Sequence, residues 1–538
     1  MSKTFARKTS GLVRQASLLD TFIYNSAASS FAGVLGTYAF GLTFAAGGNI
    51  LAAIPLSLFA FSIAIVYALL VSTFPRSGGD YVFNSRVLHP SLGFGFNFSL
   101  VFWQTFFLAF NFYLITFFGI GPGVHIIGYL TNSNVLIDAG QFLMTPWASF
   151  LVGSALNILF TFLALSGTKR MLLANNVIWL IMMLGIGSAI VSLALVGNQG
   201  FIGLFNGFMS SYGGPYGSAP NPYQAVIDSA KISGYSVPPF AFAWPLVALV
   251  TNAIWWTFYS AYIAGEVKEA NSVKRNLISM AGAGIFNLVC LALLLYYSLQ
   301  TFGYDFLASL SYLATYSPNG LPWANALEMI TAFFGLVARN PLLAAIVVLG
   351  MALAGTLIYT VVIYLQISRN IFAWSMDRLI PEKMSEVSPR FHTPTYTNLT
   401  MFLICEAFLV VVAAFPDAFW TFFFSTIIGP AFSCMFLPGI TAALLPYRHK
   451  DIYEASPAKR EVLGVPLMTI AGAAEVLFVI FIAYEFIAYP DFGISNPTAL
   501  FLNFGMIGVG FALYWIIRFL RKRQGVDVDL AFKEIPPV

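Results

Sequence analysis

Long runs of apolar residues recur along the whole 538-residue chain, separated by short polar segments. The runs are continuous and lack the alternation of a membrane β-barrel, so they predict helices. A helix needs about 20 residues to cross the hydrocarbon core of a bilayer. The pattern therefore predicts an all-α integral membrane protein with about twelve transmembrane helices. The predicted spans are Leu18–Phe44, Leu51–Phe74, Leu92–Ile120, Trp147–Leu165, Met171–Val196, Ala241–Gly265, Leu277–Phe302, Leu342–Trp374, Asn398–Phe415, Ala418–Leu445, Val465–Tyr489 and Ala499–Leu520.

The basic residues support this number of spans. With the N-terminus inside, all but Lys231 and Arg339 of the 26 lysines and arginines fall in inner segments. Such a bias is typical of the cytoplasmic loops of membrane proteins. One missed or invented span would invert the pattern for the rest of the chain. We therefore expect a multi-pass protein of the plasma membrane with both termini in the cytoplasm.

The composition agrees with this assignment and narrows the function. Hydrophobic residues make up 59% of the chain and charged residues only 9%, far below the ~25% of soluble domains. Cys290, Cys405 and Cys434 lie in apolar stretches, with no spacing typical of disulfides or metal sites. The sequence contains no constellation of catalytic side chains. We therefore expect neither an enzyme nor a protein that binds a cofactor, a metal or nucleic acid.

Few charged side chains lie inside the predicted spans, where they are costly and therefore informative. Glu406 lies in the middle of the ninth span and Glu475 in the middle of the eleventh. Either glutamate could carry a proton or another ion. Alternatively, both make paired polar contacts between helices, which is the favoured interpretation.

Two predicted spans contain unusual segments. The first span holds the small and hydroxylated run Asn25–Ser30, which permits either close helix packing or a break in the helix. The sixth holds the aromatic run Trp255–Tyr262, which could line a pocket or form an interfacial belt. Both pairs of interpretations stay open at this point.

Three stretches on the inner side carry motifs. Pro75-Arg76-Ser77-Gly78-Gly79-Asp80-Tyr81 precedes the third span, and Gly265-Glu266-Val267-Lys268 with Lys274-Arg275 follows the sixth. Arg369-Asn370-Ile371-Phe372-Ala373 leads to Asp377-Arg378-Leu379-Ile380-Pro381 after the eighth, and Thr393-Pro394 comes before the ninth. In order and spacing, the chain resembles the amino acid–polyamine–organocation (APC) superfamily of amino acid permeases.

The resemblance implies a LeuT-like fold of two inverted five-helix repeats plus two C-terminal helices. The implied organisation is a cytoplasmic N-terminus (1–17), a first repeat (18–196), an extracellular loop (197–240), a second repeat (241–445), a cytoplasmic loop (446–464), helices eleven and twelve (465–520) and a cytoplasmic tail (521–538). A short helix is also predicted around Trp323–Phe334 in the second long outer connection.

The resemblance also implies that helices one and six are discontinuous and bind the substrate between them. The amino acid's carboxylate would meet NH groups of helix one, and its ammonium would meet carbonyls of helix six. The predicted substrate-binding residues are Asn25, Ser26, Ala27, Ala28, Ser29 and Ser30 of helix one, Gln104, Leu108 and Asn111 of helix three, and Trp256, Thr257, Phe258, Tyr259 and Ser260 of helix six. Arg14, Glu266 and Asp377 are predicted to form an inner gate.

The expected function is secondary active transport of an amino acid by alternating access, as uptake or exchange. No carboxylate lies near the predicted pocket, which favours neutral or apolar amino acids. A membrane nutrient receptor or a channel on the same fold is the alternative. Besides the substrate and the lipid bilayer, the expected partner is H⁺ or Na⁺ as a coupling ion. The sequence leaves open the choice of ion and the oligomeric state.

The motifs also depart from the family pattern. Ser26–Ser30 replaces the Gly-(Ser/Ala)-Gly-Ile of the first helix, and Trp255-Trp256-Thr257 occupies a position where glycine is common. The fifth span contains no lysine of the kind that serves proton coupling in some relatives. The hydroxyls of Thr356 and Thr360 could serve sodium, although such threonines more often bond their own helix.

Overall fold

The computed structural model describes residues 11–29, 50–237, 244–317, 319, 321, 326–416 and 425–533. Ser30, the rest of the first predicted span and the start of the sixth lie outside these residues. So do Trp323 and the start of the tenth predicted span. In the described residues, the chain is almost entirely helical.

The first half of the chain forms a succession of helices. They are α1 (Leu18–Ala27), α3 (Ile50–Ser57), η1 (Leu58–Ala60), α4 (Phe61–Thr73), α5 (Asp80–Val87), α6 (Pro90–Leu114), the π-helical turn η2 (Ile115–Ile120), α7 (Gly121–Thr131), α8 (Asn134–Leu143), α9 (Pro146–Leu165), α10 (Thr168–Tyr212), α11 (Gly214–Gly217), α12 (Pro222–Ile232), α13 (Pro245–Thr251), η3 (Tyr259–Ala261) and η4 (Ala264–Glu266).

The second half adds further helices and one small hairpin. They are α14 (Val273–Phe302), α15 (Tyr304–Tyr316), α16 (Ala326–Val337), α17 (Pro341–Gly355), η5 (Leu357–Tyr359), α18 (Thr360–Met376), η6 (Glu382–Ser385), α19 (Thr395–Ala414), α21 (Ser425–Arg448), α22 (Lys450–Ala455), the antiparallel strands β1 (Glu461–Val462) and β2 (Val465–Pro466), α23 (Leu467–Ala488), η7 (Pro490–Phe492), α24 (Pro497–Leu500), the π-helical turn η8 (Phe501–Gly505), α25 (Met506–Arg523) and η9 (Val528–Lys533).

Ten helical runs of the described residues are long and apolar enough to cross a membrane. They are Leu51–Thr73, Pro90–Thr131, Pro146–Leu165, Thr168–Tyr212, Val273–Phe302, Leu357–Met376, Thr395–Ala414, Ser425–Arg448, Leu467–Ala488 and Pro497–Arg523. The predicted spans without a counterpart in this set are the first and the sixth. The all-α, multi-pass architecture predicted from the sequence is therefore confirmed.

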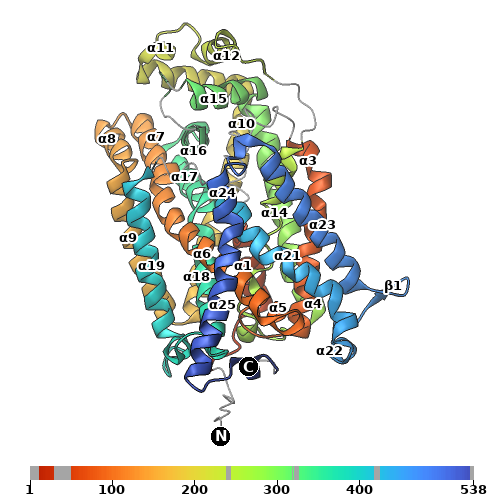
Figure 1. Ribbon diagram of the computed structural model, residues 1–538. Helices are drawn as coiled ribbons and strands as arrows, with labels where there is room; N and C mark the ends of the chain where they lie inside the picture. The colour runs from red at the N-terminus through yellow and green to blue at the C-terminus, as the bar shows by residue number, and fades with distance from the viewer. Residues whose placement is uncertain are drawn as a thin grey trace.

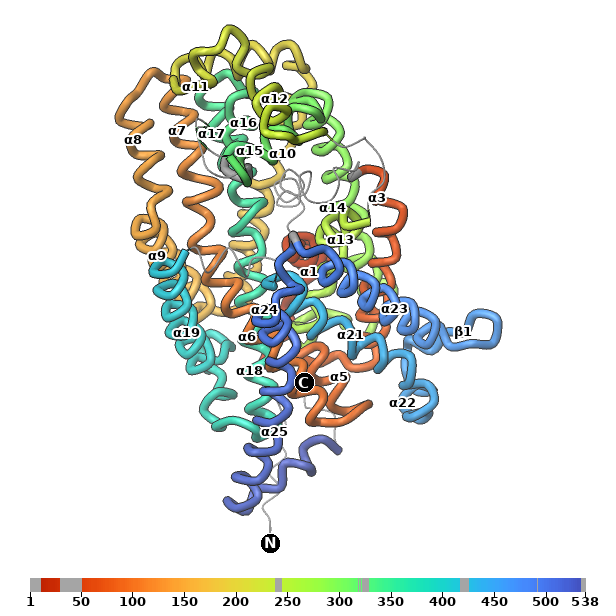
Figure 2. Tube along the Cα trace, turned by 45° about the horizontal axis from the view of Figure 1, so that its top comes forward, coloured from red at the N-terminus to blue at the C-terminus, as the bar shows by residue number. Residues whose placement is uncertain are grey.

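The long helices run side by side and give the bundle two distinct ends (Figure 1). Helices α5 and α22 lie at one end, and α11, α12 and α15 gather at the other, as Figure 2 also shows. We refer to these as the α5 end and the α12 end. Helix α18 lies inside the bundle, and the run Leu357–Met376 is buried along its whole membrane-length window.

The sixth span does not continue as an α-helix. Regular structure ends at Thr251, and the next segment is held by short-range bonds such as Ala253 N to Val250 O and Phe258 N to Trp256 O. Helix α1 likewise ends at Ala27, where the Ser29 amide bonds back to the Ser26 carbonyl.

The eighth span is also interrupted, which the sequence pattern did not predict. Helix α17 ends at Gly355, and Thr356 has a non-helical backbone with φ −139° and ψ −72°. One short turn, η5, separates it from α18. In the part of the chain that the structure describes, the first, sixth and eighth spans therefore leave the regular α-helical pattern.

The segment 197–240, predicted as an outer loop, is largely helical. Helix α10 runs past the predicted end of the fifth span to Tyr212, with a kink at Gly197. Helix α12 follows, and Tyr223 on it stacks on Phe306 of α15, with ring centroids 4.3 Å apart. The third span also extends beyond its predicted end, and α8 folds back beside α7.

Glycines allow two central helices to touch through their backbones. A Cβ on Gly185 of α10 would lie 2.4 Å from the Cα of Gly350 on α17 and 2.7 Å from the carbonyl oxygen of Ile346. Small residues at such crossings permit the close approach that stabilises helix pairs in lipid.

We expect Gly185→Ala to destabilise the protein by about 1–3 kcal/mol, because the added methyl meets backbone atoms that cannot rotate away. Gly187→Ala is the matched control, since a Cβ at Gly187 would have no other atom within 4 Å. Thermal unfolding in detergent measures the difference. Equal melting temperatures for the two variants would contradict the close crossing.

Candidate functional site

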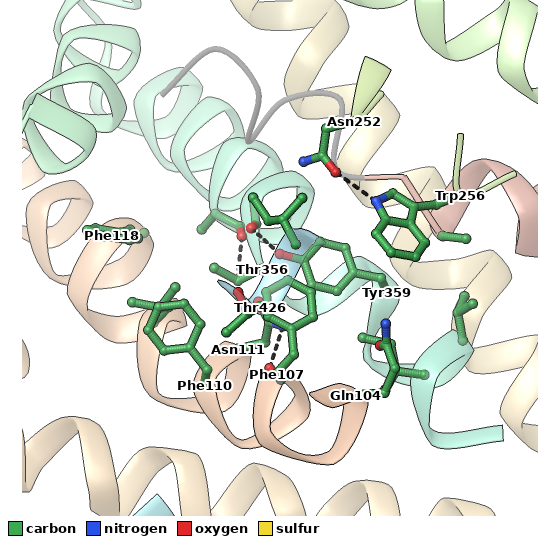
Figure 3. A pocket seen from close by; sticks show the side chains of 18 of the residues that line it. Gln104, Phe107, Phe110, Asn111, Phe118, Asn252, Trp256, Thr356, Tyr359 and Thr426 are labelled. Carbon is green, nitrogen blue, oxygen red and sulfur yellow. Dashed lines mark hydrogen bonds between the residues drawn. The ribbon is translucent and has the colours of Figure 1, made fainter. Parts of the chain in front are cut away.

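A cavity of about 110 Å³ lies where the three irregular spans meet. This volume is many times the ~10–15 Å³ that one water molecule requires. Helices α6, α16, α17, α18 and α21 contribute to its walls, together with η2, η5, the segment after α13 and Ala28 at the end of α1 (Figure 3). Its lining residues are Ala28, Gln104, Phe107, Phe110, Asn111, Leu114, Phe118, Gly119, Asn252, Trp256, Tyr259, Ile330, Thr331, Met351, Ala352, Gly355, Thr356, Tyr359, Val362, Ile363, Thr426 and Ile427.

Aromatic rings form much of the wall. Phe107 of α6 stacks on Tyr359 of η5, with centroids 5.4 Å apart and planes 8° from parallel. Trp256 meets Tyr259 edge to face at 6.0 Å. The first contact joins the third span to the eighth, and the second lies within the sixth span.

The polar groups of the wall are all neutral at physiological pH. Asn252 accepts a hydrogen bond of 2.7 Å from the Trp256 indole N–H (Figure 3). Asn111 donates to the Phe107 carbonyl at 2.7 Å, and its own Oδ1 is buried without a hydrogen-bond partner in the described part of the chain. Thr356 donates to the Ala352 carbonyl at 2.7 Å. None of the described lining residues carries a formal charge, so the cavity suits a ligand with no net charge.

Five of the predicted substrate-binding residues line this cavity. They come from three predicted segments and are Ala28, Gln104, Asn111, Trp256 and Tyr259. The buried rings of the sixth span lie inside the protein, which argues against an interfacial belt for Trp255–Tyr262.

The other described candidates do not line the cavity. Asn25 donates to the Ser260 hydroxyl and the Ser279 carbonyl, both at 3.0 Å, and accepts a bond of 2.8 Å from the Ser260 amide. Ser26 donates to Asn287 at 2.7 Å. In the structure, these residues tie helix one to the sixth and seventh spans.

The remaining candidates are buried in the packing around the cavity. Leu108 is fully buried, and Ser29 is 1% exposed. The Thr257 hydroxyl donates to the Ile254 carbonyl, and Phe258 stacks on Tyr67 with centroids 3.9 Å apart. Ala27 is also fully buried.

Glu266 forms a completely buried ion pair near the α5 end. Its Oε1 accepts a hydrogen bond of 2.6 Å from Nε of Arg369, and both side chains are 0% exposed. The Thr168 hydroxyl donates to Glu266 at 2.5 Å and accepts from Arg369 at 2.7 Å. This triad joins the start of α10 and the η4 turn of the sixth span to α18, the buried half of the eighth span.

Asp377 forms a second ion pair, at the end of α18. Both of its oxygens accept from the Arg86 guanidinium, at 2.6 and 2.7 Å, and the Tyr81 hydroxyl donates at 2.6 Å. Arg14 is exposed. The three predicted gate residues therefore do not form one network, because Glu266 and Asp377 belong to separate ion pairs. Beside Arg14, the backbone amides of Gln15 and Ala16 donate hydrogen bonds to the Glu266 carbonyl.

The sequence did not reveal the cationic partners of Glu266 and Asp377, and it indicated Thr356 of the eighth-span wall only as a candidate sodium ligand. Arg369 lies in the motif at the end of the eighth span, which the sequence alone marks only as a family signature. Thr356 and Tyr359 follow Gly355 in the middle of an unusually long apolar run. The predicted span Leu342–Trp374 is longer than one membrane crossing requires, and it contains a glycine followed by a threonine near its middle. This combination is the signal that could have identified the break.

Asp80 is a buried acid on α5, the short helix between the second and third spans. Asn97 donates to both of its oxygens, at 3.1 and 3.2 Å, and accepts at 2.9 Å from the Trp374 indole. Burial raises the pKa of Asp80 to about 7, despite the hydrogen bonds that favour its ionised form. A carboxyl that titrates near neutral pH is unusual outside functional sites.

The two mid-span glutamates differ sharply. Glu406 of α19 accepts hydrogen bonds from Ser154 and, at 2.9 Å, from Asn157, both on α9. This arrangement agrees with the paired-contact interpretation, between the fourth and ninth spans. Both oxygens of Glu475 are buried, and neither has a hydrogen-bond partner in the described residues.

A bundle of membrane-length helices, interrupted around an internal uncharged cavity, defines a multi-pass membrane protein with a ligand site between its helices. A family model described as amino acid permease matches residues 22–512, which is most of the chain. The chain belongs to the amino acid permease family of the APC superfamily, whose members share the LeuT-like fold. These proteins are transporters and not enzymes, as the sequence predicted. No curated protein matches the chain.

We expect Glu266→Gln to destabilise the protein by about 3–5 kcal/mol, because Arg369 would stay buried without a countercharge. Glu454→Gln is the control, since the Glu454–Lys459 pair is exposed and screened by water. Thermal unfolding of the two variants is the measurement. A Glu266→Gln melting temperature that matches the control would show that the buried pair does not hold this end of the bundle.

The stability of the protein should depend on pH through Asp80. Because folding raises the pKa of Asp80 from 3.8 to about 7, the folded state holds its proton more tightly than the unfolded chain. Stability should therefore fall as pH rises from about 4 to about 7, by up to about 4 kcal/mol, and then level off. Asp80→Asn should flatten the plot of melting temperature against pH over this range. An unchanged slope in the variant would refute the assignment to Asp80.

Proposed function

We propose that this permease is a secondary active transporter of neutral, apolar amino acids that works by alternating access. The observation that carries the proposal is the uncharged cavity, lined by aliphatic and aromatic side chains, at the meeting point of the irregular spans. An apolar side chain would pack against rings such as Phe107 and Trp256. A lysine, arginine or glutamate side chain would enter a cavity whose described walls offer no countercharge.

Irregular backbone supports the recognition of the zwitterion. Where a helix ends, its last carbonyls and first amides have no partner within the helix. The end of α1 at Ala27 and the irregular segment after Thr251 lie beside the cavity. The carbonyls at these two C-terminal ends would bind the ammonium of the substrate, and amides of the irregular segments would bind its carboxylate.

The two buried ion pairs supply a mechanism for closing one side. Glu266–Arg369 and Asp377–Arg86 both involve α18 or the residue that follows it, and both lie toward the α5 end of the cavity. Opening that side requires separation or bodily movement of these pairs. We propose that the α5 end faces the cytoplasm, in the plasma membrane, because the basic residues cluster in its segments.

A proteoliposome uptake panel of the common amino acids tests the function directly. We expect accumulation or exchange of leucine, phenylalanine or similar substrates, and little transport of lysine or glutamate. The panel is run with and without imposed proton and sodium gradients. Absence of accumulation and exchange under every condition would reject a transporter and favour a receptor on this fold.

Within this panel, Trp256→Phe should weaken the apparent affinity for the best substrate about tenfold, or ~1.4 kcal/mol. The variant loses the N–H bond to Asn252 and part of the cavity wall. Trp255→Phe is the matched control, because Trp255 bonds the same Asn252 oxygen at 3.2 Å but does not line the cavity. Equal effects of the two substitutions on KM would count against the cavity as the substrate site.

A further inference from the structure

Glu475 is the most unusual acid in the membrane part of the chain. It lies midway along α23, is completely buried, and neither carboxyl oxygen has a hydrogen-bond partner in the described residues. An ionised carboxylate in such a place would be very costly. The side chain must therefore hold a proton, or bind a cation, for most of the time.

Close helix packing seals this carboxyl from the lipid. A Cβ on Gly472 of α23 would lie 2.3 Å from the carbonyl oxygen of Gly439 on α21, and a Cβ on Gly439 would lie 3.3 Å from Cγ of Glu475. The two helices thus meet through glycines at the level of the acid. The carboxyl faces the protein interior.

A phenol and a thiol lie within electrostatic reach of Glu475. Its charge would act on the Tyr67 hydroxyl of α4 and on the Cys434 thiol of α21. The Tyr67 hydroxyl also donates to the Cys434 carbonyl at 2.5 Å. The neighbouring elements α13 and η1 contain no titratable residue. A metal cation would require several oxygen ligands, whereas a proton requires one.

Asp80 approaches the same pair of groups from the α5 end. Its charge also acts on Tyr67 and Cys434, and the Tyr262 hydroxyl lies beside its carboxylate. The ring of Tyr262 packs over Gly79, where a Cβ would lie 2.6 Å from Cδ1. Arg86, the cation on the same helix, is paired with Asp377. Two buried acids therefore flank one cluster of hydroxyl and thiol groups.

We propose that Glu475 and Asp80 are the proton-binding sites of this permease and that H⁺ is its coupling ion. The neutral Glu475 carboxyl loses one H⁺ and becomes a carboxylate, and the Asp80 carboxylate takes up one H⁺ and becomes neutral. The charges of both acids act on the Tyr67 hydroxyl, and the Tyr262 hydroxyl lies beside Asp80, so these two hydroxyls would relay the proton. Asp80 then releases the proton at the α5 end. This inference rests on the proposed transport function, and it names the ion that drives it.

The place of Tyr262 suggests how the proton and the substrate communicate. Tyr262 belongs to the irregular sixth-span segment whose Trp256 and Tyr259 line the cavity. Its carbonyl accepts a hydrogen bond of 3.0 Å from the Gly78 amide, beside Asp80. A movement of this segment on substrate binding would shift the hydroxyl that faces Asp80. Protonation of Asp80 and binding of the substrate would thereby both change the position of the irregular sixth-span segment.

The test uses tritiated leucine in proteoliposomes that contain a pH-sensitive dye. With an acidic exterior, we expect the wild type to accumulate leucine at least tenfold above the exchange-only level and to acidify the lumen. Glu475→Gln should abolish both the accumulation and the acidification, while leucine exchange across the membrane continues. Asp80→Asn should reduce the gradient-driven accumulation at least fivefold. Glu406→Gln, a mid-span acid with hydrogen-bond partners, should behave as the wild type.

The outcomes separate this inference from the proposed function. Leucine exchange by the wild type with no response to the pH gradient would overturn the proton sites and leave the transporter intact. Gradient-driven accumulation by Glu475→Gln at the wild-type level would also overturn them. Neither exchange nor accumulation of any amino acid by the folded wild type would instead reject the proposed function and, with it, this inference.

A spectroscopic measurement covers the case in which Glu475→Gln does not fold. Infrared spectra of the wild type between pH 5 and pH 8 should contain the C=O band of a protonated carboxyl in an apolar site. Glu475→Asp should shift the frequency of this band, and Glu406→Gln should leave it unchanged. Absence of a protonated carboxyl band in the wild type at pH 5 would overturn the assignment.

Discussion

The need to satisfy every backbone N–H and C=O without water governs this structure. In lipid, that need enforces continuous helices, and irregular backbone is tolerated only where protein surrounds it. The sixth span loses its α-helical pattern after Thr251, and the eighth is interrupted at Thr356. Both irregular segments lie inside the bundle and border the same cavity. The segments without regular helical hydrogen bonds are therefore the segments whose backbone N–H and C=O groups can bind a ligand.

Helix α18 transmits this arrangement to the α5 end. At its start, Tyr359 and Val362 border the cavity, and the Tyr24 hydroxyl of α1 donates to the Val362 carbonyl at 2.9 Å. Further along, Arg369 forms the buried pair with Glu266. Because one buried helix carries both the cavity wall and the ion pair, a shift of α18 would alter the two together. A buried ion pair adds little net stability, but a state in which one partner stays buried without the other is strongly destabilised. Such a pair favours a transition between a fully closed and a fully open state.

Different parts of the structure were predictable for different reasons. The long apolar runs set the spans, because hydrophobic length alone decides which segments cross a membrane. The interruption after Gly355 was not predicted, since glycine and threonine also occur within continuous membrane helices. The partner of Glu266 was not predicted either, because Arg369 lies about a hundred residues away in sequence and only the packing of α18 brings it near. Five of the predicted site residues border the cavity, whereas Asn25 and Ser26 serve the packing of helix one, since polarity alone does not show which face of a helix meets an open space.

The two mid-span glutamates show why residue type is insufficient to infer function in a membrane. By sequence, Glu406 and Glu475 are equivalent: each is an acid near the centre of an apolar run. Glu406 accepts bonds from Ser154 and Asn157, so its charge is compensated by dipoles fixed on the adjacent helix. Among the described residues, neither oxygen of Glu475 has a hydrogen-bond partner, and its charge would act on the Tyr67 hydroxyl and the Cys434 thiol. An acid buried without such compensation is explained if it gains and loses a proton during transport. Asp80, the second buried acid, would accept that proton by way of the Tyr67 and Tyr262 hydroxyls and release it at the α5 end.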